Sequence, residues 1–270
     1  MFYGQIMMQN YLSDPSVSFC AVDDTLDRAP LQITDFGQGV QIDQLISKIY
    51  LESGGSGEES CHEAYELSAY FYLRQCELSK VEIPYFFITG DEHFYSKIKQ
   101  KTVEQIMGNI PKEKSSFFGS IKKLFGGSED ISSIEIWQQL KKKFNVFHLH
   151  KPYGGNAIQK GELSDWIDAL GEEWILEMKT PKACIDVILG VIALTSGIRT
   201  MEEYIKDMEA RGQSKERIEE VNYSLRHLTP DFLKKNVVRY QGKEEAGKSS
   251  TMEEIKEEKS GVEEEKKEEK

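Results

Sequence analysis

One stretch of ten residues, "IPYFFITGDE" at 83–92, constrains the fold of this chain most. Its apolar run is nearly continuous, which is typical of a strand covered on both faces, and such strands belong to parallel sheets. Covering both faces requires helices on both sides of the sheet. The run ends on Gly90, Asp91 and Glu92, so acidic side chains follow the strand directly. We therefore expect an α/β protein whose functional edge lies at the carboxyl ends of its strands.

The segments around this strand alternate between strand and helix patterns. Further strands are expected at 17–24, 30–36, 145–152 and 173–178. Helices are expected at 2–13, 41–52, 64–77, 94–107, 133–144, 163–171, 181–198, 200–210 and 214–227. Apolar residues on one helical face, such as Ile42, Leu45 and Ile49, indicate helices that pack against a sheet. Strands alternating with helices predict a mainly parallel central sheet between two helical layers.

The composition divides the chain into four parts. Residues 1–107 form the first half of the α/β core, and residues 133–228 form its C-terminal part with closing helices. Between them, residues 108–132 are rich in Gly, Ser and Lys, which indicates a flexible insertion. Residues 242–270 are rich in Glu and Lys and have no apolar face, so we expect a disordered acidic tail.

Charge and hydropathy exclude several classes of protein. The net charge of −12 argues against nucleic-acid binding, which requires clustered Lys and Arg. The N-terminus lacks the pattern of a signal peptide, and the longest apolar run, 184–198, contains Asp186 and is too short for a bilayer. We expect a cytoplasmic protein. The basic, aromatic stretch "SSFFGSIKKLFGG" at 115–127 is the one hint of membrane or partner contact, the alternative being an insertion whose Phe residues pack on the body.

The cysteines give no metal or redox signature. Cys20, Cys61, Cys76 and Cys184 form no C-x-x-C pair and have no zinc-ligand spacing. Three of them lie in apolar surroundings, which is typical of buried free thiols.

Several ordered blocks carry a resemblance to a known family. They are "PLQITDF…IDQLISKIYLESGGSG…EAYELSAYF", then "IPYFFITGDE", "NVFHLHKPYG" and the segment 186–213. Over residues 3–228 the chain resembles von Willebrand factor A-like (vWA-like) proteins of unassigned function. The resemblance implies a Rossmann-like three-layer sandwich that acts as a non-enzymatic adaptor. Such domains bind another protein, often through a Mg²⁺ whose open position accepts a carboxylate of the partner.

The resemblance also implies a set of site residues. The family's metal site combines a D-x-S-x-S loop, a Ser or Thr after a Gly-rich turn, and an Asp after a later strand. Asp91 matches the late Asp, and Ser60 is the candidate hydroxyl, although an alignment on the following helix places Ala64 where the hydroxyl residue would stand. We therefore expect Asp91 and Ser60 to contact any cation. Asp24, Glu63 and Glu92 complete the expected partner-binding surface.

The D-x-S-x-S loop is represented only by "DPSVS" at 14–18, which precedes a strand instead of following one. Asp14 should therefore lie at the edge of the sheet opposite to Asp91, in a turn begun by Asp-Pro. The family's first strand has no counterpart here, and its place lies between the strands 17–24 and 83–90. An N-terminally truncated chain, another strand, or a strand from a partner would each account for this. Mg²⁺ binding should be weak or absent.

The competing function is a metal-dependent hydrolase that uses Asp91, Glu92 and His93, with His62 nearby. It requires these side chains to converge in one cavity. A fragment without independent function is a third interpretation. No G-x-S-x-G elbow, Walker loop or G-x-G-x-x-G turn occurs, and we expect a protein that is not an enzyme.

Other acidic and His residues have simpler interpretations. Asp23, Asp24 and Asp27 follow a strand and are interpreted as a solvated acidic turn, with support of a metal loop as the alternative. His148 and His150 alternate along a strand and face the same side, which favours packing or surface roles.

Overall fold

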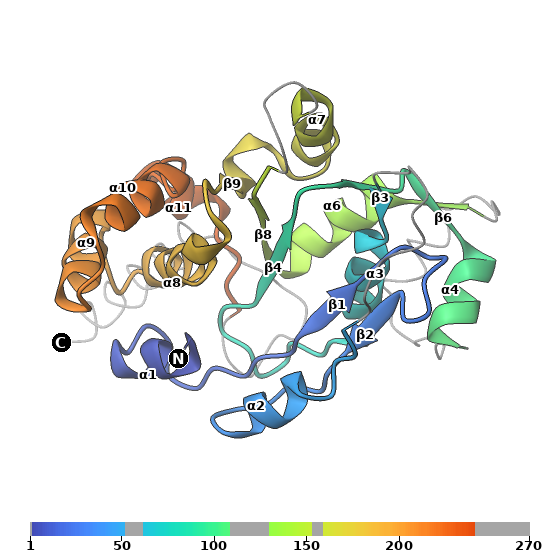
Figure 1. Cartoon of the computed structure of the whole chain (residues 1–270), viewed down its shortest axis with the longest axis horizontal. Coiled ribbons are helices and arrows are strands. Elements are labelled where there is room, and N and C mark those ends of the chain that lie inside the picture. Colours follow the sequence, from blue (N-terminus) through green and yellow to red (C-terminus); the bar gives the residue numbers. More distant parts are fainter. Residues whose placement is uncertain (1, 52–61, 109–129, 153–158, 241–270) are drawn as a thin grey trace, which may run out of the picture.

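The computed structural model describes residues 2–51, 62–108, 130–152 and 159–240, which form a mixed α/β structure (Figure 1). Its central sheet has three strands in the order β4 (Tyr85–Gly90), β8 (Asn145–His150) and β9 (Ile175–Glu177). Both strand pairs are parallel, as the apolar runs predict. The sheet therefore brings the carboxyl ends of all three strands to one edge.

β8 is the middle strand and is buried along its whole length. The amide of Asn145 donates to the carbonyl oxygen of Pro84 at 2.9 Å, and the amide of Met178 donates to His150 at 2.8 Å. Alternate residues of β8 thus bond to β4 and to β9, which is the pattern of a strand paired on both edges.

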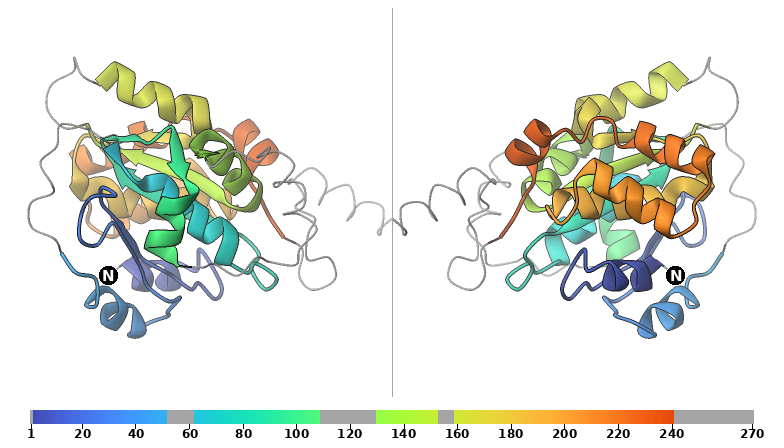
Figure 2. Two further views of the ribbon diagram at one scale, coloured as in Figure 1. Left: turned by 90° about the vertical axis from the view of Figure 1, so that its right-hand side faces the viewer. Right: turned by 90° about the vertical axis from the view of Figure 1, so that its left-hand side faces the viewer.

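Helices cover both faces of this sheet, and Figure 2 shows the layers from two sides. On one face lie α3 (Tyr65–Gln75), α6 (Ser133–Lys143) and α7 (Gln159–Leu170). On the other face lie α1 (Phe2–Met8), α8 (Cys184–Thr195), α9 (Met201–Ala210), α10 (Lys215–Ser224) and α11 (Pro230–Asn236). Among the described helices, none has the length and apolar character needed to cross a bilayer.

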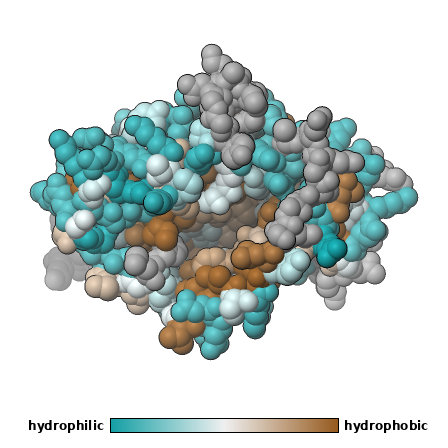
Figure 3. Space-filling view, in the orientation of Figure 1, coloured by the Kyte–Doolittle hydropathy of each residue, from teal (hydrophilic) through white to brown (hydrophobic). Residues whose placement is uncertain are grey.

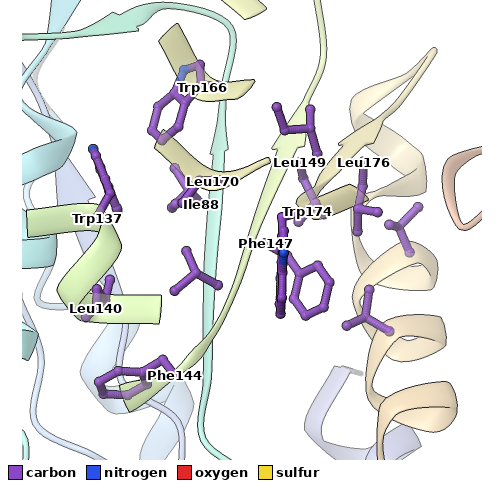
Figure 4. Packing of buried hydrophobic residues seen from close by; sticks show 14 of the residues in the cluster. Ile88, Trp137, Leu140, Phe144, Phe147, Leu149, Trp166, Leu170, Trp174 and Leu176 are labelled. Atoms are coloured by element: carbon purple, nitrogen blue, oxygen red, sulfur yellow. The ribbon is translucent and has the colours of Figure 1, made fainter. Parts of the chain in front are cut away.

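The hydrophobic core follows from the alternation of side chains along β8 (Figure 4). Phe147 and Leu149 point to the side of α8, whereas Trp137 and Trp166 cover the opposite face. All four side chains are fully buried. Since successive residues of a strand face opposite sides, one apolar strand supplies both halves of the core.

Short strands and helices surround the central sheet. β1 (Cys20–Val22) and β2 (Leu31–Ile33) form an antiparallel hairpin. β3 (His62–Glu63) pairs in parallel with β5 (His93–Phe94), and β6 (Lys97–Lys99) pairs antiparallel with β7 (Asp130–Ser132). The remaining α-helices of the described chain are α2 (Gln41–Ile46) and α4 (Gln100–Met107), and a 3-10 turn over Pro181–Ala183 precedes α8.

The hairpin lies beside β4 without pairing to it (Figure 1). Tyr72 of α3 contacts both, because its hydroxyl lies 2.5 Å from Ser18 Oγ and its ring meets that of Phe86 at 5.4 Å. Within the described chain, the edge of β4 away from β8 and the edge of β1 away from β2 have no strand partner. This is the place where the sequence predicts a missing strand.

Several expectations need correction. The helix expected at 41–52 ends at Ile46. Residues 94–107 are helical only from Gln100, since the preceding residues form β5 and β6. Residues 130–132 at the end of the expected insertion form β7, while 109–129 lie outside the described residues. The expected strand at 173–178 begins as a 3-10 turn, Glu172–Trp174, and is extended only over β9.

At the C-terminal side, α11 follows the last helix that the sequence predicts. The chain then continues to Tyr240, whose amide donates to the carbonyl oxygen of Glu82 at 2.8 Å. The acidic tail at 242–270 lies outside the described residues.

Candidate functional site

The carboxyl ends of the parallel strands border an open cleft of about 440 Å³. Thr89, Gly90 and Asp91 come from β4 and the turn after it, and Lys151 follows β8. The wall on the side of α8 is formed by Met178, Pro181 and Cys184. Asp91 thus lies where the continuous strand 85–90 predicts, and the cleft presents an acid and an amine together.

An acidic cluster adjoins this cleft and contains the expected partner-binding residues. Glu63 lies on β3, Asp24 in the turn after β1, and Glu92 in the turn after β4. Burial and, after it, the neighbouring charges of Glu92, Asp23, Asp24 and Asp27 together raise the pKa of Glu63 to about 8. A shift of this kind requires the acids to be close, so the structure brings these three predicted residues together.

Asp24 is held in a turn within this cluster. Its Oδ1 accepts the amide of Leu26 at 3.0 Å, and its Oδ2 accepts the hydroxyl of Tyr95 at 2.9 Å. The side chain is buried. Asp24 therefore fixes the loop after β1. The acidic turn that the sequence indicates is present, but the side chain of Asp24 is buried in it and not solvated as expected.

The two His residues near the cluster stack on each other. β3 and β5 place His62 opposite His93, with ring centroids 5.4 Å apart, and His62 also stacks on Tyr95 at 5.1 Å. His93 Nδ1 lies 2.8 Å from Asp165 Oδ2 of α7. His93 is thus oriented toward α7, whereas Asp91 lines the cleft. The hydrolase hypothesis requires these two side chains in one cavity.

The residues that match the D-x-S-x-S loop lie in the turn before β1. Asp14 Oδ1 and Ser16 Oγ both accept from the side-chain amide of Gln38, at 2.8 and 3.0 Å, in the turn before β1. Their place before a strand is the one that the sequence predicts. Ser60 lies outside the described residues. In the part of the chain that the structure describes, no three His, Cys, Asp or Glu side chains form a group that could hold a metal ion.

His148 and His150 belong to the core. Both are buried, and the ring of His148 stacks on that of Trp166 with centroids 4.1 Å apart. Burial lowers the pKa of each imidazole, and for His148 the shift is large. The packing role that their alternation favours is the observed one.

Several residues of this region are not apparent from the sequence. Glu66, Lys151, Asp165 and Cys184 come from elements that meet only after folding. Cys184 is a free thiol whose pKa is raised by burial, and Cys20 and Cys76 are also free. Cys61 lies outside the described residues. One signal for Lys151 exists, because it follows a buried strand as Asp91 does.

No family model, curated protein or solved structure matches this chain.

Proposed function

We propose that this chain is a non-enzymatic, vWA-like protein-interaction domain with a Rossmann-like three-layer arrangement, acting in the cytoplasm. The order β9, β8, β4 with an antiparallel hairpin beside β4 supports this fold (Figure 1). The partner would be another protein, recognised at the carboxyl edge of the sheet.

One observation carries the proposal, namely the collection of acids from β3 and from the turns after β1 and β4 beside an open cleft. Glu63, Asp91 and Glu92 lie at one edge, and burial together with neighbouring acids raises the pKa of Glu63 to about 8. Placing like charges together costs stability, so a gathered set of acids indicates a surface that binds something basic. An open cleft with an acidic border suits a protein surface that carries Lys or Arg.

The test is affinity capture from cell extract with charge-reversed variants. The variant Glu63→Lys/Asp91→Lys changes the acidic edge, and the matched control Glu202→Lys/Glu209→Lys changes two exposed acids of α9. A partner that binds here should be retained by the wild-type chain and the control, and reduced about tenfold or more by the edge variant. Equal retention by all three would contradict the proposal.

A Mg²⁺ requirement is tested separately by calorimetry. Because the described acids do not form a metal-binding group, we expect little heat from Mg²⁺ titration. Asp91→Ala is the comparison, and identical heats for the two chains would end the metal hypothesis.

A further inference from the structure

Two strand edges lie side by side, and within the described residues some of their backbone groups have no hydrogen-bond partner. The ladder with β8 uses Phe86, Ile88 and Gly90, so the amides and carbonyls of Tyr85, Phe87 and Thr89 turn to the other edge. Beside β1, the backbone groups of Phe19 and Asp23 form hydrogen bonds toward the β2 side of the hairpin. The backbone N–H and carbonyl groups of Cys20 and Val22 therefore point away from β2. We call the space between these edges the slot, defined by Cys20, Val22, Tyr85, Phe87 and Thr89.

The slot is closed on one side and open on the other. Tyr72 of α3 closes one side through its contacts with Ser18 and Phe86. On the other side, Figure 3 shows a hollow where Figure 1 draws β4 between α8 and β1. Hydrophobic residues gather on the rim of this hollow (Figure 3). The side chains of Cys20, Val22 and Phe87 are only partly buried, so an added strand would remove apolar surface from water.

The charges at one end of the slot indicate which sequence would fit. Asp23 follows β1 directly, and its carbonyl oxygen accepts the amide of Ala64, beside Glu63. Asp91 and Glu92 follow β4. The carboxyl ends of both edges therefore open on the acidic cluster, which attracts a cationic side chain.

We propose that the slot binds an extended segment of a partner protein as an added strand, consisting of about five apolar residues followed by Lys or Arg. This rests on the proposed protein-binding function and adds the chemistry of the partner. The strand runs parallel to β4, because β4, β8 and β9 all run the same way and uniform sheets are favoured. Its backbone satisfies both edges, and its apolar side chains cover both faces.

A synthetic peptide tests the backbone pairing. The probe has five alternating Val and Ile residues followed by Lys-Arg, and carries a fluorophore for anisotropy measurements on the full chain. Saturable binding should slow amide exchange at Cys20, Val22, Tyr85, Phe87 and Thr89. Phe86 and Ile88, which already pair with β8, should change little. Methylating alternate backbone nitrogens of the peptide should weaken binding about tenfold. Equal binding of the methylated peptide would overturn the proposal.

Two variants and one altered peptide locate the site. Val22→Lys places a charge in the slot and should abolish binding, whereas Val40→Lys at the exposed start of α2 should leave binding unchanged. Asp91→Asn removes a carboxylate that follows β4, and it should weaken binding several-fold and reduce its dependence on salt. Moving Lys-Arg to the amino end of the peptide should have a similar effect. Equal binding by the two Val variants would overturn the proposal.

Other outcomes separate this inference from the proposed function. If the peptide fails to bind while charge reversal of Glu63 and Asp91 still removes a captured partner, the slot is not the site and the proposed function stands. Slow exchange of the slot amides in the free, monomeric chain would show that the chain itself fills the slot. A stable dimer in sedimentation, with those amides protected, would assign the slot to a second copy.

Discussion

At the residue scale, Glu66 is the most unusual side chain near the site. It lies in the first turn of α3 and is fully buried, and neither carboxylate oxygen makes a well-formed hydrogen bond within the described chain. Burial raises its pKa to about 8, opposed by the nearby backbone of Glu66 and Tyr95. The acid therefore keeps its proton in the folded protein near neutral pH, and this proton couples folding to pH.

Glu66→Gln should make stability less dependent on pH. Because the folded pKa is raised, the contribution of Glu66 is complete below its unfolded pKa and is lost as pH rises through about 8. A neutral amide removes this loss, so the variant should gain about 1–2 kcal/mol over wild type at about pH 9, and little at about pH 5. Urea unfolding at both pH values measures this. The exposed Glu77→Gln is the control, and an unchanged pH profile for Glu66→Gln would contradict the assignment.

Site residues were predictable where they follow a strand. Asp91, Glu92 and Asp24 follow strands that the sequence reveals, and parallel strands end at one edge. The contact between His93 Nδ1 and Asp165 Oδ2 joins residues 72 positions apart, and no local pattern indicates it. The burial of Glu66 was equally hidden, because an acid in the first turn of a helix is ordinarily a solvated, stabilising residue.

At the element scale, continuous apolar runs predicted β4 and β8, whereas ambiguous periodicity misplaced 94–99. Phe94 and Ile98 are both buried and four residues apart, which fits one face of a helix. Lys97, Ile98 and Lys99 also alternate as a strand does, and pairing with β7 decides the outcome. Because β7 is more than thirty residues further along, tertiary structure and not local preference selects the strand.

Close packing joins β4 to α3 at Gly90. A Cβ placed on Gly90 would lie 2.1 Å from the hydroxyl oxygen of Tyr65, which begins α3. Real side chains do not approach so closely, so glycine is required for α3 to approach the carboxyl end of β4. The position of Asp91, the next residue, depends on this contact.

Gly90→Ala should lower the free energy of unfolding by about 1–3 kcal/mol through overpacking. Because the nearest atom is a hydroxyl oxygen, Tyr65→Phe in the same chain should restore part of the loss. Thermal unfolding of the single and double variants measures this. Gly4→Ala in α1 meets no atom within 4 Å and should be nearly neutral. If the loss in the free energy of unfolding of the double variant equals the sum of the losses of the two single variants, the contact with Tyr65 is not the cause of the destabilisation.

At the scale of the whole molecule, Asn145 joins three distant segments. Its side-chain Nδ2 donates to the carbonyl oxygens of Pro84 at 3.0 Å and Val238 at 2.9 Å, and its Oδ1 accepts the amide of Val238 at 2.7 Å. The residue is fully buried at the start of β8. The start of the central sheet is thus fastened to the segment after α11.

Asn145→Ala should destabilise the protein by about 2–4 kcal/mol, because it removes three hydrogen bonds at a fully buried position, two of them to the amide and carbonyl groups of Val238. Differential scanning calorimetry measures the fall in Tm. Asn236→Ala is the matched control, since its side chain makes one bond, to the carbonyl oxygen of Phe232, at an exposed site. Limited proteolysis should cut Asn145→Ala after α11 sooner than the control. Equal Tm values would show that the C-terminal segment is held by other contacts.

The two open edges also bear on how this protein is produced in a cell. Backbone groups that accept one partner strand accept any extended apolar chain, including a nascent chain or another unfolded protein. A copy made in excess over its partner is therefore exposed to coaggregation and to proteolysis. Under the strand-addition proposal, matched synthesis of the two polypeptides is part of what keeps this domain intact, and its abundance follows the supply of its partner.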